Sequence, residues 1–155
     1  MLKLFFHRMM DVCGGLLLAA LKISGLGAPS KRFRFQDIRR ILVIRTDRIG
    51  DLILSTPAFS ALRDHFPNAH IACLVDLYTS DLVEGNPCLS EIITYSRKKI
   101  RNPVRMVNFV ARLRREKFDM AVVLNYAPDA ILMAYLSGAP VRVGSRIPGF
   151  GAATP

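Results

Sequence analysis

The stretch ILVIRTDRIGDLILSTPAFSALRDHFPNAHIACLV, residues 41–75, decides the fold. It opens with a β-branched run at 41–45 and closes with a second apolar run at 70–75. Short apolar runs of this kind are typical of strands buried in a parallel sheet. Residues 51–66, between them, have the apolar spacing of a helix. The stretch therefore predicts a strand–helix–strand unit.

Pro57 divides the predicted helix at 51–66. Because proline lacks an amide hydrogen, either the helix bends there or a second helix begins with Thr56 as its N-cap and Pro57 at its first position. We expect the apolar residues of one side to face the core: Leu52, Ile53, Phe59, Leu62 and Phe66.

The alternation of strands and helices continues along the chain. Such alternation predicts an α/β fold, a Rossmann-like parallel sheet with helices on both faces and right-handed crossovers. In the helix at 103–117 we expect five residues to face inward: Val104, Val107, Phe109, Val110 and Leu113. The further predicted strands are 91–95, 119–125 and 141–144, and the further helices are 79–84, 103–117 and 128–137.

The composition fits one domain with a polyanionic partner. The chain has 155 residues, and 22 Lys+Arg against 12 Asp+Glu give a formal net charge of +10. Such a charge indicates nucleic acid, anionic lipid head groups or a phosphorylated glycolipid. Nucleic acid ranks last, because no helix-turn-helix, zinc-finger or RNA-recognition motif is present. We therefore expect a glycolipid or membrane partner and no nucleic acid.

The cysteines and histidines favour neither a disulfide framework nor a metal site. Three cysteines are an odd number, and no pair has CxxC spacing. A reducing compartment fits this pattern best. The residues concerned are Cys13, Cys73, Cys88, His7, His65 and His70.

Residues 1–40 differ from the globular part. Residues 1–30 are apolar, and three interpretations stay open for them: a helix lying in a membrane interface or docking on the domain, a signal peptide, and a membrane-spanning helix, for which the run is short. Residues 31–40, KRFRFQDIRR, are either a solvated basic linker or a strip that meets acidic head groups. We expect the globular domain at 41–145 and an interdomain linker, cut short, at 146–155.

The turn after the first strand is the main candidate site. Ligands of open α/β sheets bind beyond the carboxyl ends of the strands, where residues 46–51 lie. Gly50 allows close backbone approach, and Asp51, at or near a helix start, can accept a proton from a hydroxyl nucleophile. The turn lacks both the GxGxxG pattern and a P-loop lysine, so dinucleotide and nucleoside-triphosphate sites are poorly supported.

The charged residues of this turn also have a structural interpretation. Asp51 would be stabilised by the free N–H groups of a first helical turn, and Asp47 would serve as an N-cap before Ile49. Arg45 and Arg48 can hold phosphate, or they can pair with the two aspartates, and for one of them we expect pairing.

Several landmarks, in order and with family-like spacing, resemble the heptosyltransferases of glycosyltransferase family 9. The first is a strand followed by a turn ending in Gly50 and Asp51, then a helix containing Thr56-Pro57-Ala58. The resemblance covers residues 40–145. The later landmarks are EGNP at 84–87 with EII at 91–93, KFD at 117–119 with VVL at 122–124, and GAPVRVG at 138–144.

The resemblance implies the amino-terminal, acceptor-binding half of a GT-B enzyme, in which two Rossmann-like domains face a cleft. Such enzymes transfer heptose from ADP-heptose to the inner core of lipopolysaccharide, with inversion and without an obligatory metal or cofactor. The family's general base corresponds to Asp51. Because no donor domain follows, we expect an incomplete enzyme: a fragment, a truncated gene product, or one piece of a split transferase whose donor domain is a separate chain. The alternative is a non-catalytic module that binds membrane or glycolipid.

An acidic inner-core acceptor suits a basic domain. The implied location is cytoplasmic, peripheral to the inner membrane. In the predicted helix 103–117, Arg112, Arg114 and Arg115 are expected to form a solvated face. The acceptor-binding candidates are Arg45, Asp47, Arg48 and Gly50 in the first turn, and Lys98, Lys99 and Arg101 after the third strand.

Overall fold

The computed structural model of the protein describes residues 34–96 and 103–144. Five strands form one sheet in the order β3-β2-β1-β4-β5, and every neighbouring pair is parallel. The fold class predicted from the alternation is therefore confirmed. The strands are β1 (Arg40–Arg45), β2 (His70–Asp76), β3 (Glu91–Tyr95), β4 (Met120–Val123) and β5 (Val141–Gly144).

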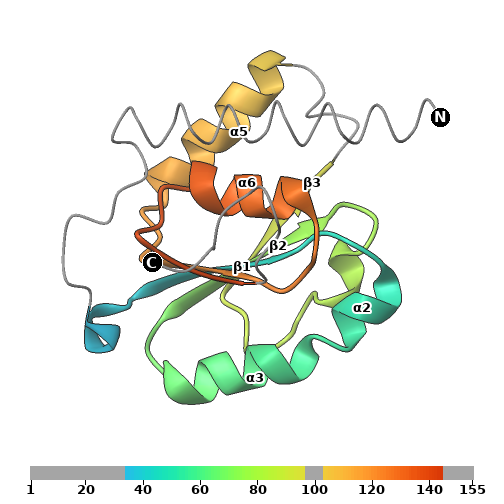
Figure 1. The fold of residues 1–155 in the computed structure, drawn as a ribbon. Helices are drawn as coiled ribbons and strands as arrows, with labels where there is room; N and C mark the ends of the chain where they lie inside the picture. The colour runs from blue at the N-terminus through green and yellow to red at the C-terminus, as the bar shows by residue number, and fades with distance from the viewer. Residues whose placement is uncertain (1–33, 97–102, 145–155) are drawn as a thin grey trace.

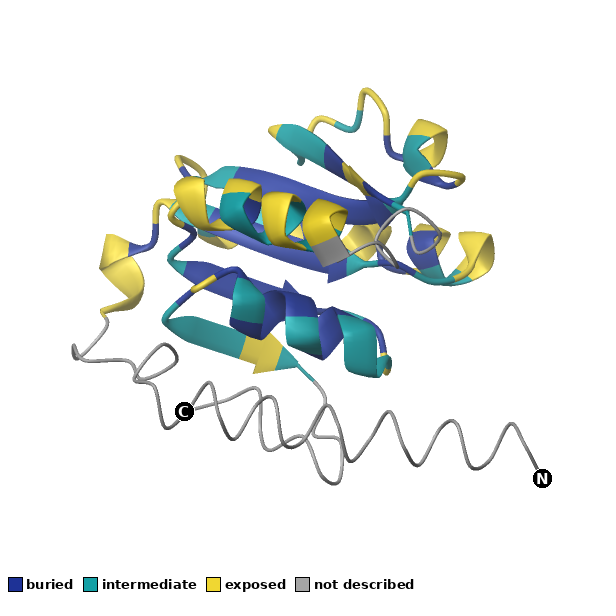
Figure 2. Cartoon of the chain, turned by 90° about the horizontal axis from the view of Figure 1, so that it is seen from above, coloured by how far each residue is buried: buried dark blue, intermediate teal, exposed yellow. Residues whose placement is uncertain are grey.

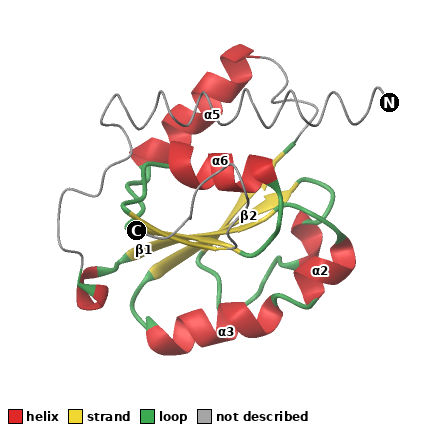
Figure 3. Ribbon diagram, in the orientation of Figure 1, coloured by secondary structure: helices red, strands yellow, loops and turns green. Residues whose placement is uncertain are grey.

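The helices cover both faces of the sheet. In Figure 1, α5 and α6 lie above the strands, and α2 and α3 lie below them. Loops link the strands to the helices that follow (Figure 3, green). The helices are α2 (Ile49–Ile53), α3 (Thr56–His65), α5 (Pro103–Arg115) and α6 (Pro128–Leu136), with 3-10 turns η1 (Phe35–Asp37) and η2 (Ser80–Leu82).

The sheet separates two hydrophobic layers, and β1 contributes to both. Leu42 and Ile44 pack with the cluster that contains Leu113 of α5. The alternate β1 residues Ile41 and Val43 pack with the cluster that contains Phe59 of α3. Side chains alternate between the faces of a strand, so a strand buried on both sides needs an unbroken apolar run. Figure 2 shows buried strands and, on α5, an exposed outer side, whereas no residue of α6 is exposed.

The predicted helix at 51–66 is two helices, α2 and α3. Of the two alternatives for Pro57, a bend or a second helix, the structure shows the second helix. The break falls at Leu54 and Ser55, but Ser55 and not Thr56 occupies the N-cap position of α3. The Ser55 hydroxyl donates to the Asp51 carbonyl oxygen (2.7 Å), and the Thr56 hydroxyl donates to the Ile53 carbonyl oxygen (2.8 Å). Both hydroxyls therefore satisfy carbonyl groups at the end of α2.

Three residues that were expected to face the core are exposed. Ile53 of α2 is exposed because the two helices do not share one helical phase. Val104 and Val107 of α5 are also exposed, since the helix packs its other apolar stripe on the sheet. That stripe consists of Met106, Phe109 and Leu113.

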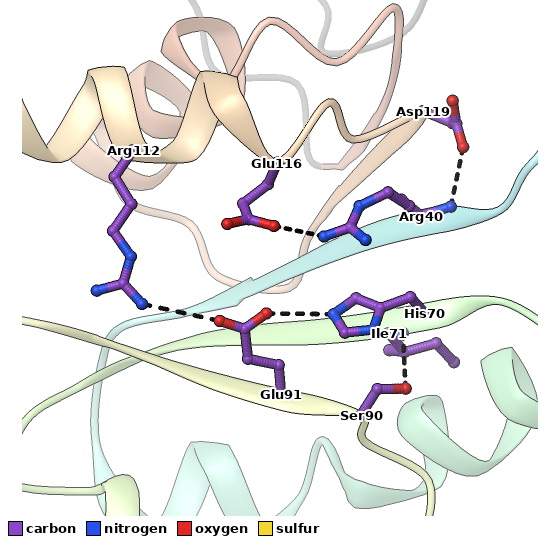
Figure 4. A network of polar contacts seen from close by, with 8 residues as sticks. All are labelled: Arg40, His70, Ile71, Ser90, Glu91, Arg112, Glu116 and Asp119. Atoms are coloured by element: carbon purple, nitrogen blue, oxygen red, sulfur yellow. Dashed lines mark hydrogen bonds and ion pairs between the residues drawn. The ribbon is translucent and has the colours of Figure 1, made fainter.

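Charged side chains form a network at the amino ends of the strands, which we call the amino edge of the sheet (Figure 4). One Asp119 carboxylate oxygen accepts the backbone N–H groups of Arg39 and Arg40, both at 2.8 Å. The Arg40 guanidinium also pairs with Glu116. These contacts tie the start of β1 to the start of β4.

A second part of this network joins β2 and β3. Glu91 lies between His70 (Nε2 to Oε2, 3.2 Å) and Arg112 of α5 (Nη2 to Oε1, 3.8 Å). The Ile71 amide donates to the Ser90 hydroxyl at 3.1 Å. Arg112 and Arg114 are exposed as predicted, although the Arg114 Nε also donates to the Leu136 carbonyl oxygen.

Some expectations concern residues outside the described part. These are the segments 1–30 and 146–155, residues 31–33 of the basic segment 31–40, and Cys13. Within residues 34–96 and 103–144, no helix is long and apolar enough to cross a membrane. In the same residues Cys73 and Cys88 are free thiols.

Candidate functional site

The carboxyl ends of β1 and β4 lie side by side where the strand order reverses. From β1 the chain proceeds to β2 and β3 on one side of the sheet, and β4 and β5 lie on the other side. The loops that leave β1 and β4 therefore diverge, and ligands of such sheets bind at this position. The predicted turn at 46–51 lies there.

Arg45, the last residue of β1, holds this edge together. Its side chain is only 11% exposed. The Nε atom lies 3.0 Å from Asp47 Oδ1, and Nη2 lies 3.7 Å from Asp51 Oδ1. Nη1 donates to the carbonyl oxygen of Leu124 in the loop after β4. Pairing was one of the two alternatives for Arg45, and the structure shows it; contact between Arg45 and an acceptor stays a prediction.

Asp51 is the most accessible carboxylate of the cluster. It lies in the first turn of α2, as expected, and 44% of its side chain is exposed although it pairs with Arg45. One face of this carboxylate thus meets a fixed cation while the other meets solvent. Such a group can accept a proton from a hydroxyl that approaches the edge.

Asp47 and Arg48 differ from the expectations. Arg48, and not Asp47, occupies the N-cap position of α2, and it makes no side-chain capping bond. The Asp47 carboxylate pairs with Arg45 instead. Arg48 is exposed beside this pair. It is therefore the more accessible of the two arginines of the turn for an anionic ligand.

Gly50 leaves open space at the start of α2. A Cβ atom added there would meet nothing within 4 Å, and the residue is exposed. The described fold therefore does not require glycine at this position. Close approach of a ligand to the backbone, the reason for which glycine was singled out, is compatible with this space.

Two residues that the sequence reasoning did not select complete the site. Asn125 Nδ2 donates to Thr46 Oγ1 (3.2 Å), and both side chains are buried. The Tyr78 hydroxyl donates to the Asp47 carbonyl oxygen (2.8 Å). Asn125 was assigned to a predicted strand, but β4 ends at Val123, which places Asn125 in the loop. A polar residue after an apolar strand run was the available signal.

Several exposed apolar side chains belong to the elements that follow β1 and β2. They lie on α2 and in the connection from β2 to η2, and such patches mark interaction surfaces when they are contiguous. Among them is Tyr78, whose ring stays accessible while its hydroxyl binds the turn. The residues are Ile49, Ile53, Leu54, Leu77, Tyr78 and Leu82.

Other parts of the described molecule offer less chemistry. A hollow of about 220 Å³ lies between η1 and the end of α3, on the opposite edge from the cluster. Its lining includes Arg39 and His65 but no carboxylate. Within residues 34–96 and 103–144, no group of three or more His, Cys, Asp or Glu could hold a metal ion. The candidates Lys98, Lys99 and Arg101 lie outside the described residues.

Comparison with curated proteins finds glycosyltransferases. The chain is 32% identical over 82 residues to a protein of Haemophilus influenzae described as a glycosyltransferase, which covers 53% of the chain and 23% of that protein. It is 28% identical over 97 residues to lipopolysaccharide heptosyltransferase 3 of Escherichia coli, which covers 61% of the chain and 28% of that protein. The chain thus spans about a quarter of the length of these relatives. No family model matches it.

Solved structures show the same relationship. A glycosyltransferase family 9 protein from Veillonella parvula superposes with a TM-score of 0.60 at 30% identity, over 66% of the chain and 30% of that structure. The ADP-heptose lipopolysaccharide heptosyltransferase II of Escherichia coli gives 0.58 at 26% identity, over 68% of the chain and 30% of that structure. Over the part that these relatives match, the comparisons support membership of glycosyltransferase family 9.

Proposed function

We propose that the chain is the acceptor-binding part of an inverting, heptosyltransferase-like glycosyltransferase that acts in the synthesis of the lipopolysaccharide core. One observation carries the proposal. A half-exposed carboxylate, Asp51, is held by the buried cation Arg45 at the ligand-binding edge of the sheet. The similarity to an ADP-heptose lipopolysaccharide heptosyltransferase supports this reading of the edge.

Asp51 acts as the general base in this proposal. An acceptor hydroxyl approaches the exposed side of the carboxylate and gives its proton to Asp51. The hydroxyl oxygen forms a bond to the anomeric carbon of the donor heptose from the face opposite the leaving group. The bond from that carbon to the ADP phosphate breaks, and ADP leaves with the electron pair. Arg45 keeps the carboxylate in position throughout.

The basic character of the chain supports an acidic acceptor. The formal net charge is +10, and Arg48 is exposed next to the catalytic turn. An inner-core acceptor carries phosphates and carboxylates, which arginine binds well. We assign acceptor binding to Arg48 and Gly50 beside the Arg45–Asp47 pair, and from the sequence also to Lys98, Lys99 and Arg101.

The donor and the membrane are proposed partners beyond this domain. ADP-heptose would bind a second domain, in the same or in a separate chain. Residues 1–30 would hold the protein at the cytoplasmic side of the inner membrane, where a lipid-borne acceptor is made.

A transfer assay tests the proposal. ADP-heptose and heptose-deficient lipopolysaccharide are incubated with the full chain alone, and with a separately produced donor domain from a relative. The expected result is heptosylated product that requires the donor domain and is lost in Asp51→Asn. The matched control is Asp64→Asn, an exposed aspartate of α3 away from the edge, which should keep full activity.

Two other results would contradict parts of this proposal. Saturable binding of the acceptor without product in either mixture would contradict the catalytic role and leave a glycolipid-binding module. Product formation that Asp51→Asn does not reduce would contradict the assignment of the base while keeping the transferase.

A further inference from the structure

The Asn125 side chain is buried, and among residues 34–96 and 103–144 only one end of its carboxamide has a partner. The residue is 2% exposed and lies two positions after the end of β4. Its Nδ2 atom donates to Thr46 Oγ1 at 3.2 Å. Its Oδ1 atom has no hydrogen-bond partner among the residues that the structure describes. Buried polar atoms are nearly always paired, so this oxygen needs an explanation.

Exchanging the two ends of the amide does not remove the deficit. In the other orientation the Thr46 hydroxyl would donate to Oδ1, and the Nδ2 hydrogens would lack an acceptor. Thr46 can therefore satisfy one end of Asn125 but not both. Either way one buried polar atom of the carboxamide stays without a partner among the described residues.

This polar atom lies at the reversal of strand order. Thr46 directly follows β1. The Asn125 side chain, in the loop after the neighbouring strand β4, donates a hydrogen bond to it. The two loops are also joined by Arg45, which donates to the Leu124 carbonyl oxygen. The next residue, Tyr126, is exposed, so the molecular surface lies one residue away. The amide is thus part of the same edge as Asp51.

We propose that Asn125, oriented by Thr46, is a recognition residue for a hydroxyl group of the acceptor. Its carboxamide forms a hydrogen bond with that hydroxyl, directly or through one bridging water. An acceptor that lacks the hydroxyl leaves the buried amide unpaired, and this disfavours its binding. The inference rests on the proposed function, because it requires a hydroxyl-bearing acceptor at this edge.

The test removes both polar groups without changing their shape. The double variant Thr46→Val, Asn125→Leu is compared with the unmodified full chain for its thermal midpoint and its affinity for heptose-deficient lipopolysaccharide. Because replacing both partners by apolar groups relieves the unmatched amide, the midpoint should equal or exceed that of the unmodified chain. The affinity should fall about tenfold, as expected for one lost hydrogen bond in a buried site.

A matched control separates recognition from folding. Ser137 is also buried, but its hydroxyl donates to the Ala134 carbonyl oxygen and accepts from the Ala139 amide, at the far end of α6. Ser137→Ala should lower the midpoint and leave the affinity unchanged. A purely structural pair would show this same pattern in the Thr46 and Asn125 variants.

Unchanged affinity in the stable double variant would overturn the inference and leave the proposed function standing. If the double variant does not fold, Asn125→Ala gives the same decision, because it keeps Thr46 and removes only the carboxamide. Failure of the unmodified chain to bind the acceptor would overturn the proposed function and this inference together.

Discussion

Charged side chains are paired differently at the two ends of the parallel strands. We call these ends the amino edge and the carboxyl edge of the sheet. At the amino edge, Asp119 accepts two backbone N–H groups, and Glu91 lies between the His70 imidazole and the Arg112 guanidinium. At the carboxyl edge, Arg45 is similarly enclosed, but Asp51 keeps a solvent-exposed side and Asn125 keeps an unmatched amide end. The amino edge is built for stability. The carboxyl edge keeps polar groups available, as a binding site requires.

The difference extends to the apolar residues. Large apolar side chains of α2 and of the connection from β2 to η2 stay exposed, although burying them would stabilise the fold. Substitutions at the amino edge should therefore lower the free energy of unfolding and leave the acceptor affinity nearly unchanged. Substitutions at the carboxyl edge should do the reverse, or reduce both where a residue such as Arg45 serves both purposes.

Among the charged residues, Asp119→Ala should have the largest effect on stability. It removes an ionised acceptor from the N–H groups of Arg39 and Arg40, and we expect a loss of about 3 kcal/mol in the free energy of unfolding. Urea unfolding measures this loss, and Asp119→Asn, which keeps one oxygen, should lose about half as much. A loss below about 1 kcal/mol, or a weaker affinity for heptose-deficient lipopolysaccharide, would break the distinction between the edges.

Arg45→Ala should reduce both stability and binding. The guanidinium is nearly buried between Asp47, Asp51 and the Leu124 carbonyl group, so its removal leaves poorly compensated carboxylates. We expect a loss of about 2 kcal/mol in unfolding free energy and an acceptor affinity that falls with it. Arg45→Lys keeps the positive charge but not the planar guanidinium group. Its stability and affinity should lie between those of the unmodified chain and Arg45→Ala. Unchanged binding in a folded Arg45→Ala variant would show that this cation is purely structural.

The centre of the sheet provides a pH-dependent reference for both edges. Burial raises the pKa of the Cys73 thiol from 9.0 to about 12. Below pH 9 the thiol is protonated in both states; above it the unfolded chain ionises first, so stability is lost as the pH rises toward 12. Between pH 8 and 10 the unmodified chain should lose about 1 kcal/mol more than Cys73→Ala. Parallel stability curves for the two proteins would contradict this.

Ile53→Ser should have the smallest effect. The side chain is exposed on α2, so we expect the unfolding free energy to change by no more than about 0.5 kcal/mol. Its neighbour Leu52 is buried, and Leu52→Ala should cost about 3 kcal/mol. Thermal unfolding of the pair measures both. Similar losses in the two variants would mean that the apolar surface of the carboxyl edge belongs to the core.

The strands were predictable because their signal is simple. A strand buried on both faces must be apolar throughout, and residues 41–44 and 71–75 meet this condition. The edge strands β3 and β5 are shorter and only partly buried. The helix faces were harder. In α5 two apolar stripes compete, and the sequence does not show that the sheet covers Met106 and Leu113 rather than Val104 and Val107.

The candidate site was predictable in position but not in pairing. The general rule for open sheets, with the Gly50-Asp51 landmark, placed the turn at the carboxyl end of β1, and the structure has it there. It did not indicate which arginine would be enclosed, because the Arg45 contacts depend on the Leu124 carbonyl group, far away in the sequence. Asn125 was missed for the same reason: its partner Thr46 lies on another strand's loop.

Mapping the acceptor onto the backbone amides tests the central claim most directly. A core oligosaccharide from heptose-deficient lipopolysaccharide is titrated into the ¹⁵N-labelled full chain, and amide chemical shifts are followed by NMR. The account predicts saturable shifts at the carboxyl edge, in Arg48, Gly50, Asp51 and Asn125, and none at the amino edge, in His70, Glu91 and Glu116. Shifts confined to the amino edge, or no saturable shifts, would contradict it.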